Sequence, residues 1–313
     1  MKNNSIILSK NNFILVILLF MTFYLLIDSK IVITTIIDMM NLFTFNVLPA
    51  LFPFFILSDL LINYNFIYYL NKLLNKPFRF LLRINGTSSF VILMSMITGF
   101  PSGAKYTKQL LDEGYLDIDT ANFLISFSHF SNPLFIFGTV FLFINNIKLT
   151  TIIFISHVLS NFIIAIICRP SRISTMDIPL KKKHSNSFVH ALSKSIYSSS
   201  KVLLLIIGDC IFISIITTLI LRNTELTPIL DVIFQGLFDL TKGISSASLL
   251  KESLFLQCLF IVSFLSFGGF GVHLQVASII GNSKIKYRNF LLGRICSVGI
   301  SILLFIILFS CFT

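Results

Sequence analysis

Charged side chains are scarce in this sequence. Asp, Glu, Lys and Arg make up 12% of the 313 residues, whereas hydrophobic side chains make up 55%. A water-soluble domain carries about a quarter charged residues. One soluble core could not bury so much apolar surface, so the composition excludes an ordinary soluble domain and predicts a protein that lies in lipid.

Sequence motifs of enzymes are missing as well. HExxH, GxSxG and GxGxxG do not occur, and "GFPSGAKYT" lacks the spacing and the strand-loop-helix setting of a phosphate-binding loop. We therefore expect neither an enzyme nor a cofactor. No CxxC pair and no histidine at metal-ligand spacing occur, so we expect no metal site and cysteines that act as small apolar side chains. The five cysteines are Cys168, Cys210, Cys258, Cys296 and Cys311.

Long apolar runs recur along the chain. At about 1.5 Å per helical residue, such runs suit a hydrocarbon core about 30 Å thick. A membrane β-barrel would show short alternating segments instead, so the runs predict an all-α, polytopic helical membrane protein. The clearest runs are residues 12–27, 42–62, 89–100, 121–144, 149–168, 202–221, 254–267 and 295–312. No small-x-small cleavage site follows "YLLIDSK", so residues 1–30 are expected to form a retained signal-anchor helix.

The net charge of +11 comes from basic residues that gather between the apolar runs. This is positive-inside patterning, which predicts three cytoplasmic segments and argues against nucleic-acid binding. Residues 169–201 are the longest such segment, predicted to be a basic cytoplasmic linker. The three groups are Lys72, Lys76, Arg79 and Arg83; Arg169, Arg172, Lys181, Lys182, Lys183, Lys194 and Lys201; and Lys284, Lys286, Arg288 and Arg294.

Helix-breaking residues interrupt two neighbouring runs in the first half. The run before Gly99 ends in "GFPSG", and Asn132 and Pro133 divide residues 121–144 into arms too short to span a bilayer. An even number of crossings must separate the first two basic groups, which also requires one segment to turn back. Non-helical backbone at membrane depth is tolerated only where protein or water in a cavity forms hydrogen bonds with its free N–H and C=O groups. We therefore expect an internal cavity.

The second half repeats this pattern. "GLFDLTKGISS" and "FGGFGVHLQVAS" again combine glycines with polar residues, and Gly99 to Gly236 and Asn132 to Gly269 are both offsets of 137. Asp59 and Asp209 occupy similar sequences whose helices should run in opposite directions. Paired interruptions of this kind predict two inverted repeats, residues 31–168 and 202–313, around a midplane site.

The break at Gly99 has the chemistry of an anion site. A helix that resumes after "GFPSG" directs unpaired N–H groups toward the break, and Lys105 adds a cation. We therefore expect a site for a small carboxylated molecule. The predicted substrate contacts are Gly99, Pro101, Ser102, Gly103, Lys105, Ser131 and Asn132 in the first half and Asp239, Lys242, Gly269, His273 and Gln275 in the second.

Other roles remain open for several of these residues. Lys105 can instead reach the interface or pair with Asp112 or Glu113, and Asp239 can pair with Lys242. Asn132 and Pro133 can shape a hairpin without touching substrate. His273 is either a proton relay or a structural residue. Asp59 and Asp209 should face the bundle or the interface, and they could couple transport to protons.

Four segments carry a resemblance to a known family. "NVLPALFPFFILSDLL", "GFPSGAKYTKQLLDEG", "FSHFSNPLFIFGTV" and "GGFGVHLQVASI" resemble the YlbJ family of sporulation integral membrane proteins, a branch of the nucleoside-recognition or gate-domain membrane proteins. The resemblance runs from about Leu42 to Arg294, and it implies that each repeat is of the gate type.

The resemblance also implies a function and a place. It implies a multi-pass membrane protein of an endospore-forming bacterium, in a membrane around the forespore, that moves dipicolinic acid. This planar dianion fits the predicted anion site. The alternatives are a sporulation membrane scaffold or ligand sensor that transports nothing, and a nucleoside-type transporter.

Overall fold

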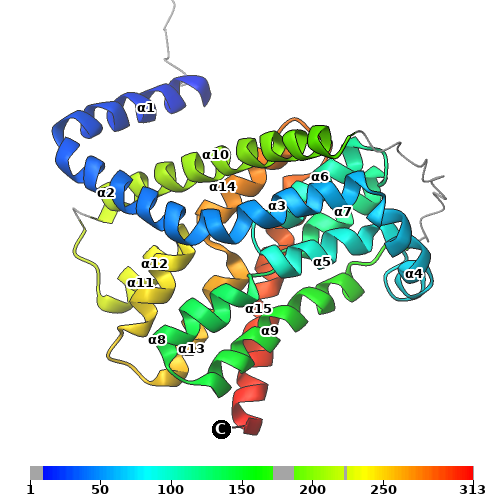
Figure 1. Cartoon of the computed structure of the whole chain (residues 1–313). Coiled ribbons are helices and arrows are strands. Elements are labelled where there is room, and N and C mark those ends of the chain that lie inside the picture. Colours follow the sequence, from blue (N-terminus) through cyan, green and yellow to red (C-terminus); the bar gives the residue numbers. More distant parts are fainter. Residues whose placement is uncertain (1–9, 172–186, 222–223, 313) are drawn as a thin grey trace, which may run out of the picture.

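The computed structural model describes residues 10–171, 187–221 and 224–312. Within these ranges every regular element is helical, so the chain is an all-α polytopic membrane protein, as predicted (Figure 1). The first half contains α1 (Lys10–Ile27), α2 (Ser29–Leu42), η1 (Phe43–Val47), α3 (Leu48–Asn63), α4 (Phe66–Leu81), η2 (Gly86–Ser88), α5 (Ser89–Thr98), α6 (Ser102–Asp112), α7 (Ile118–Phe127), η3 (Phe135–Val140), α8 (Phe141–Ile144) and α9 (Ile147–Ile167). The second half contains α10 (Phe188–Leu221), α11 (Pro228–Phe238), α12 (Leu240–Ser248), α13 (Leu254–Phe267), α14 (Gly269–Ile280) and α15 (Tyr287–Phe312).

The predicted domain boundaries cross some of these elements. Residues 1–9 of the predicted signal anchor and 172–186 of the predicted basic linker lie outside the described residues. The single helix α10 runs through residue 201, where the linker was predicted to end. The division into anchor, linker and two repeats stays a prediction.

Several helices are long and apolar enough to cross a bilayer. In the described part of the chain, four qualify, or up to six if each of two bent helix pairs forms one span. The bends are 49° between α2 and α3 and 102° between α4 and α5. Large apolar side chains such as Phe80 and Leu142 are exposed, as expected for a surface that faces lipid.

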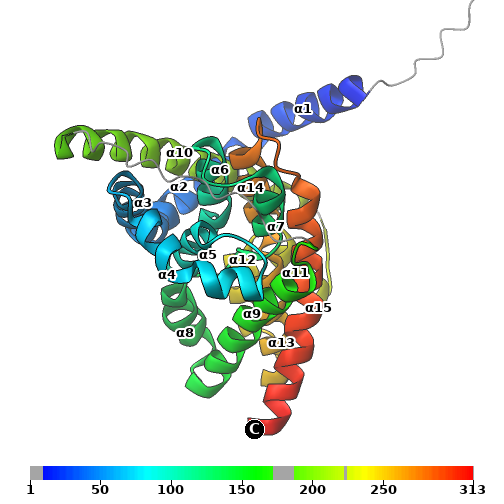
Figure 2. The same cartoon turned by 90° about the vertical axis from the view of Figure 1, so that its right-hand side faces the viewer.

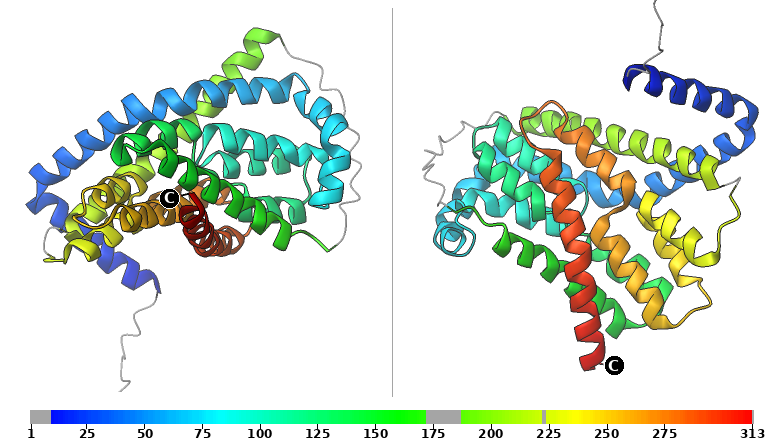
Figure 3. Two further views of the ribbon diagram at one scale, coloured as in Figure 1. Left: turned by 90° about the horizontal axis from the view of Figure 1, so that it is seen from below. Right: turned by 180° about the vertical axis from the view of Figure 1, so that it is seen from behind.

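The long helices α9 and α15 pack against each other, and α15 lies along one edge of the molecule in Figure 2. Figure 1 places the short helices α11 and α12 on one side of this pair and α5, α6 and α7 on the other, and the view from behind agrees (Figure 3). Helix α10 packs along α2, α3 and α14. Two sets of short helices therefore flank one central pair.

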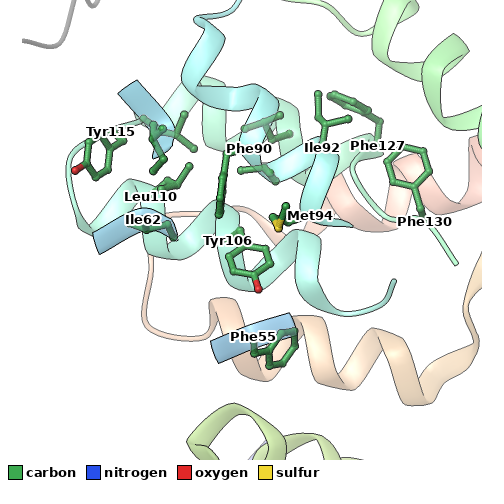
Figure 4. Close-up of a cluster of buried hydrophobic side chains, with 14 of the residues drawn as sticks. Phe55, Ile62, Phe90, Ile92, Met94, Tyr106, Leu110, Tyr115, Phe127 and Phe130 are labelled. Atoms are coloured by element: carbon green, nitrogen blue, oxygen red, sulfur yellow. The ribbon is translucent and has the colours of Figure 1, made fainter. Parts of the chain in front are cut away.

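Each set of short helices has its own hydrophobic core. One core gathers around α3, α5, α6 and α7, where Phe55, Phe90 and Tyr106 are completely buried (Figure 4). The other lies among α9, α12, α13 and α15 and includes Ile244 and Phe305. A third, smaller cluster, which includes Ala104, Ile125 and Val276, joins α6 and α7 to α14.

The breaks lie where the sequence predicts them. Helix α5 ends at Thr98 and α6 starts at Ser102, and residues 128–132 are non-helical between α7 and η3. In the second half, Asp239 separates α11 from α12, and Gly268 separates α13 from α14. The two arms of the predicted re-entrant segment, α7 and η3 with α8, are confirmed as separate short helices.

Candidate functional site

A cavity of about 450 Å³ lies where the breaks of both halves meet. Its size falls in the usual range for a small-molecule site. Both π-helical segments, η1 and η3, contribute to its wall, and such segments are frequent at functional sites. The lining residues are Met39, Leu42, Phe45, Val47, Ala50, Leu51, Thr98, Gly99, Phe100, Ser131, Asn132, Leu134, Phe135, Thr139, Ile206, Cys210, Ile213, Asp239, Leu240, Thr241, Gly268, Gly271, Val272 and Gln275.

Five of the twelve predicted contacts line this cavity. They are Gly99, Ser131, Asn132, Asp239 and Gln275, and they come from both halves of the chain. The other seven lie outside its wall. Sequence reasoning thus placed the breaks in the right region, while the structure decided which side chains reach the cavity.

Asn132 holds the first break together. Its Oδ1 accepts a hydrogen bond from the Leu134 N–H at 2.7 Å, and its Nδ2 lies 3.5 Å from the carbonyl oxygen of Thr98. Gly99 adopts φ +80°, and a Cβ there would lie 2.8 Å from the backbone nitrogen of Asn132. Only glycine fits this close approach, so Gly99 and Asn132 build one continuous section of the cavity wall.

Glycines form the second break as well. Gly268 and Gly269 have φ of +93° and +71°, and a Cβ at Gly269 would lie 3.1 Å from the backbone nitrogen of Leu240 at the start of α12. One turn and a half further along α14, the Gln275 Nε2 lies 3.1 Å from the Cys210 Sγ. The sequence prediction named Gly269, whereas Gly268 and Gly271 of the same glycine cluster are the ones that line the cavity.

Lys105 points away from the cavity. Its ammonium lies 2.8 Å from a carboxylate oxygen of Asp59 on α3, and both side chains are 5% exposed. None of the sequence alternatives for Lys105 named this partner. Asp112 instead pairs with Lys108 on the surface of the same helix. The predicted cation is therefore neutralised inside the first core.

Three predicted contacts next to Lys105 support the backbone instead. Ser102 donates a hydrogen bond to the carbonyl of Gly99 at 2.5 Å, and Pro101 precedes the start of α6. A Cβ at Gly103 would lie 1.9 Å from the carbonyl oxygen of Ser128. These residues let α6 lie directly against the first break without lining the cavity.

The charged residues of the second half are also not paired as the sequence suggested. The Lys242 ammonium donates to the Ser214 hydroxyl at 2.8 Å and lines a separate pocket of about 370 Å³. Asp239 caps α12 and accepts hydrogen bonds from two backbone N–H groups, those of Thr241 and Lys242. Of the described lining residues, Asp239 is the one that carries a charge.

His273 contacts protein groups at both ring nitrogens. Its Nδ1 lies 2.7 Å from the Tyr287 hydroxyl, and its Nε2 lies 3.2 Å from the Phe267 carbonyl oxygen. The ring therefore connects the start of α15 to the end of α13, behind the cavity wall.

One assignment of the sequence analysis is corrected by the structure. Arg294 was grouped with the cytoplasmic basic residues, but it lies inside α15 and its side chain is completely buried. The apolar run after Arg294 marked only the second part of this helix, which already begins at Tyr287. His157 of α9, also completely buried, was missed because a single histidine in an apolar run carries no motif.

These features define a class of membrane protein: a polytopic helical bundle with broken helices around an internal cavity. The chain is 33% identical over 289 residues to the sporulation integral membrane protein YlbJ of Bacillus subtilis (strain 168), and the match covers 80% of this chain and 70% of that protein. The chain belongs to the YlbJ family of sporulation integral membrane proteins. No family model and no solved structure matches it.

Proposed function

We propose that this protein carries a small carboxylated metabolite, dipicolinic acid, across a membrane around the forespore. The cavity at the junction of the two sets of helix breaks is the observation that carries this proposal. Interrupted helices at such a junction are where transporters of inverted-repeat architecture bind substrate. Rocking of one half against the other would expose the cavity to each side in turn.

Equivalent positions in the two halves support the repeat. At the offset of 137, Phe123 and Phe127 correspond to Phe260 and Phe264, and the two rings of each pair contact each other within their helix, tilted by 46° in the first pair and stacked at 19° in the second. The hydroxyls of Ser160 on α9 and Ser297 on α15, again 137 apart, lie 2.9 Å from each other. A residue that touches its own equivalent lies on a two-fold axis, so α9 and α15 would be the central pair of the pseudo-symmetric bundle.

The cavity lining suggests how a planar dianion would be held. Amide and hydroxyl groups of Thr98, Ser131, Asn132, Thr241 and Gln275 are distributed over a mostly apolar wall. Helix α12 also starts at the cavity, but the Asp239 carboxylate already caps its first N–H groups. Neutral donors in the lining, rather than Lys105 and Lys242, would thus recognise the substrate.

Uptake of labelled dipicolinate by vesicles that contain only this protein tests the proposal. We expect Asn132→Ala and Gln275→Ala to reduce the initial rate about tenfold, because each removes a hydrogen-bonding side chain from the cavity wall. Lys108→Ala, on the exposed face of α6, is the matched control and should transport normally. A protein that shows no uptake above empty vesicles would contradict transport, and competition by nucleosides would indicate the nucleoside-type alternative.

Cys210 offers a direct test of substrate binding. It lines the cavity, whereas Cys168, Cys296 and Cys311 are exposed elsewhere and Cys258 is buried. In a protein whose other four cysteines are replaced by serine, saturating dipicolinate should slow labelling of Cys210 by a small thiol reagent at least about tenfold, since bound substrate excludes the reagent.

The same measurement separates the alternatives. Protection of Cys210 together with uptake supports a carrier, and protection without uptake supports a ligand sensor. Labelling that is unchanged by dipicolinate would remove this cavity as the dipicolinate site.

A further inference from the structure

A buried guanidinium connects the two helix breaks from behind. Arg294 Nη1 lies 3.1 Å from the carbonyl oxygen of His129, in the first break, and 3.3 Å from that of Ser266, at the end of α13. Its Nη2 donates to Asn161 Oδ1 at 2.5 Å. In the described part of the chain, its hydrogen-bond partners are these three neutral oxygens.

His157 makes a second connection between the same two breaks. Its Nε2 accepts a hydrogen bond from the backbone N–H of Ser131 at 2.9 Å. The proton of the neutral ring therefore lies on Nδ1, where it can be donated to the Ser266 hydroxyl 3.2 Å away. This side chain is completely buried and lines none of the cavities described above.

The two connections are equivalent by position. His157 and Arg294 are 137 residues apart, as are His129 and Ser266. The first-half residue His157 contacts Ser266, and its second-half equivalent Arg294 contacts His129. Such reciprocal contacts are the pattern of a two-fold interface, and they lie beside the Ser160 to Ser297 contact between α9 and α15.

We propose that Arg294 and His157 are positioning residues that hold the two helix breaks in a fixed mutual arrangement, so that both breaks shift together. Each side chain comes from a central helix and forms hydrogen bonds with both halves of the chain. Contacts confined to one half could not link the two breaks. A guanidinium suits this role because it stays charged and its planar fork can serve several oxygens at once. The carbonyl ends of α7 and α13 carry partial negative charge, which stabilises the buried cation. The inference rests on the proposed function only in treating the breaks as gates.

Thiol labelling tests this coupling without any substrate. Three proteins each keep one thiol: Cys210, which contacts Gln275 beyond the second break; Thr98→Cys at the first break; and Cys258, which is buried in the second core. Labelling rates are compared with and without Arg294→Gln. We expect the first two thiols to react at least about tenfold faster in the variant, because the loss of charge-assisted hydrogen bonds shifts both breaks toward open states.

Controls separate coupling from general unfolding. Cys258 should stay unreactive, and Arg288→Gln, an exposed arginine of the same helix, should leave all three rates unchanged. If Arg294→Gln does not fold, Ser266→Ala takes its place, because it removes only the hydroxyl that contacts His157. We then expect a smaller increase in the labelling rate at both breaks. Acceleration at one break alone, or unchanged rates in a folded variant, would overturn the proposal. Because no transport is measured, a failure here is distinct from a failure of the carrier proposal.

Discussion

Replacing Lys105 by alanine is expected to destabilise the folded protein by about 3–5 kcal/mol. The change would leave the Asp59 carboxylate buried without its partner, 2.8 Å away in the native structure. The surroundings are aromatic and apolar, since the Lys105 ammonium lies 4.4 Å from the ring centre of Phe55 and 4.6 Å from that of Tyr106. Figure 4 shows these two rings next to each other within the first core, where they meet edge-on at 88°. Unfolding of the purified protein by a denaturing detergent measures the loss.

Two comparisons sharpen this expectation. Lys108→Ala breaks an exposed pair with Asp112 on the same helix and should cost only about 0.5 kcal/mol. The double change Asp59→Leu with Lys105→Met should recover most of the loss, because it removes both charges from the core. If Lys105→Ala costs no more than Lys108→Ala, the Lys105–Asp59 pair is not a buried ion pair.

This result bears on how the site is tested. A loss of transport in Lys105→Ala would follow from the damaged core, even though Lys105 never contacts substrate. Asn132 and Gln275, which line the cavity, are the informative positions.

Gly293→Ala is expected to cost about 3 kcal/mol or more, or to prevent folding. A Cβ at this position would lie 1.8 Å from the backbone carbonyl oxygen of Ser126, so α7 and α15 could not approach each other as they do. Backbone atoms cannot rotate out of the way as a flexible side chain can, which places this change at the severe end of overpacking. Yield of monodisperse protein and detergent-induced unfolding report the effect.

Gly299→Ala is the matched control on the same helix. No atom lies within 4 Å of a Cβ built there, so this change should be neutral or stabilise the helix by about 0.5–1 kcal/mol. Equal behaviour of the two variants would show that the close approach of α7 and α15 does not limit folding.

Much of the fold was predictable because local chemistry decides it. The scarcity of charge and the apolar runs required a helical membrane protein, and Gly99, Asn132 and Gly268 lie in stretches whose backbone cannot continue a helix. The expectation of an internal cavity followed, because broken backbone at membrane depth must be satisfied by protein or water. The cavity was found between those breaks.

The roles of the ionisable residues were not predictable in the same way. Lys105 and Asp59 are 46 residues apart, and Arg294 reaches a carbonyl 165 residues away. Such partners depend on which helix faces pack together, which no local pattern records. A basic residue near the start of an apolar run reads as a cytoplasmic charge, and only its position in the packed bundle shows that Arg294 is buried.

The sequence by itself determined the helical class and where the helices break, since hydrophobicity, glycine and proline act on the backbone within a few residues. The tertiary structure alone decided that Lys105 turns into a core, that Asp239 is the charge facing the cavity, and that Arg294 and His157 join the two breaks. Those outcomes depend on the packing of distant helices, because a buried polar group must find its partner wherever the fold brings one within reach.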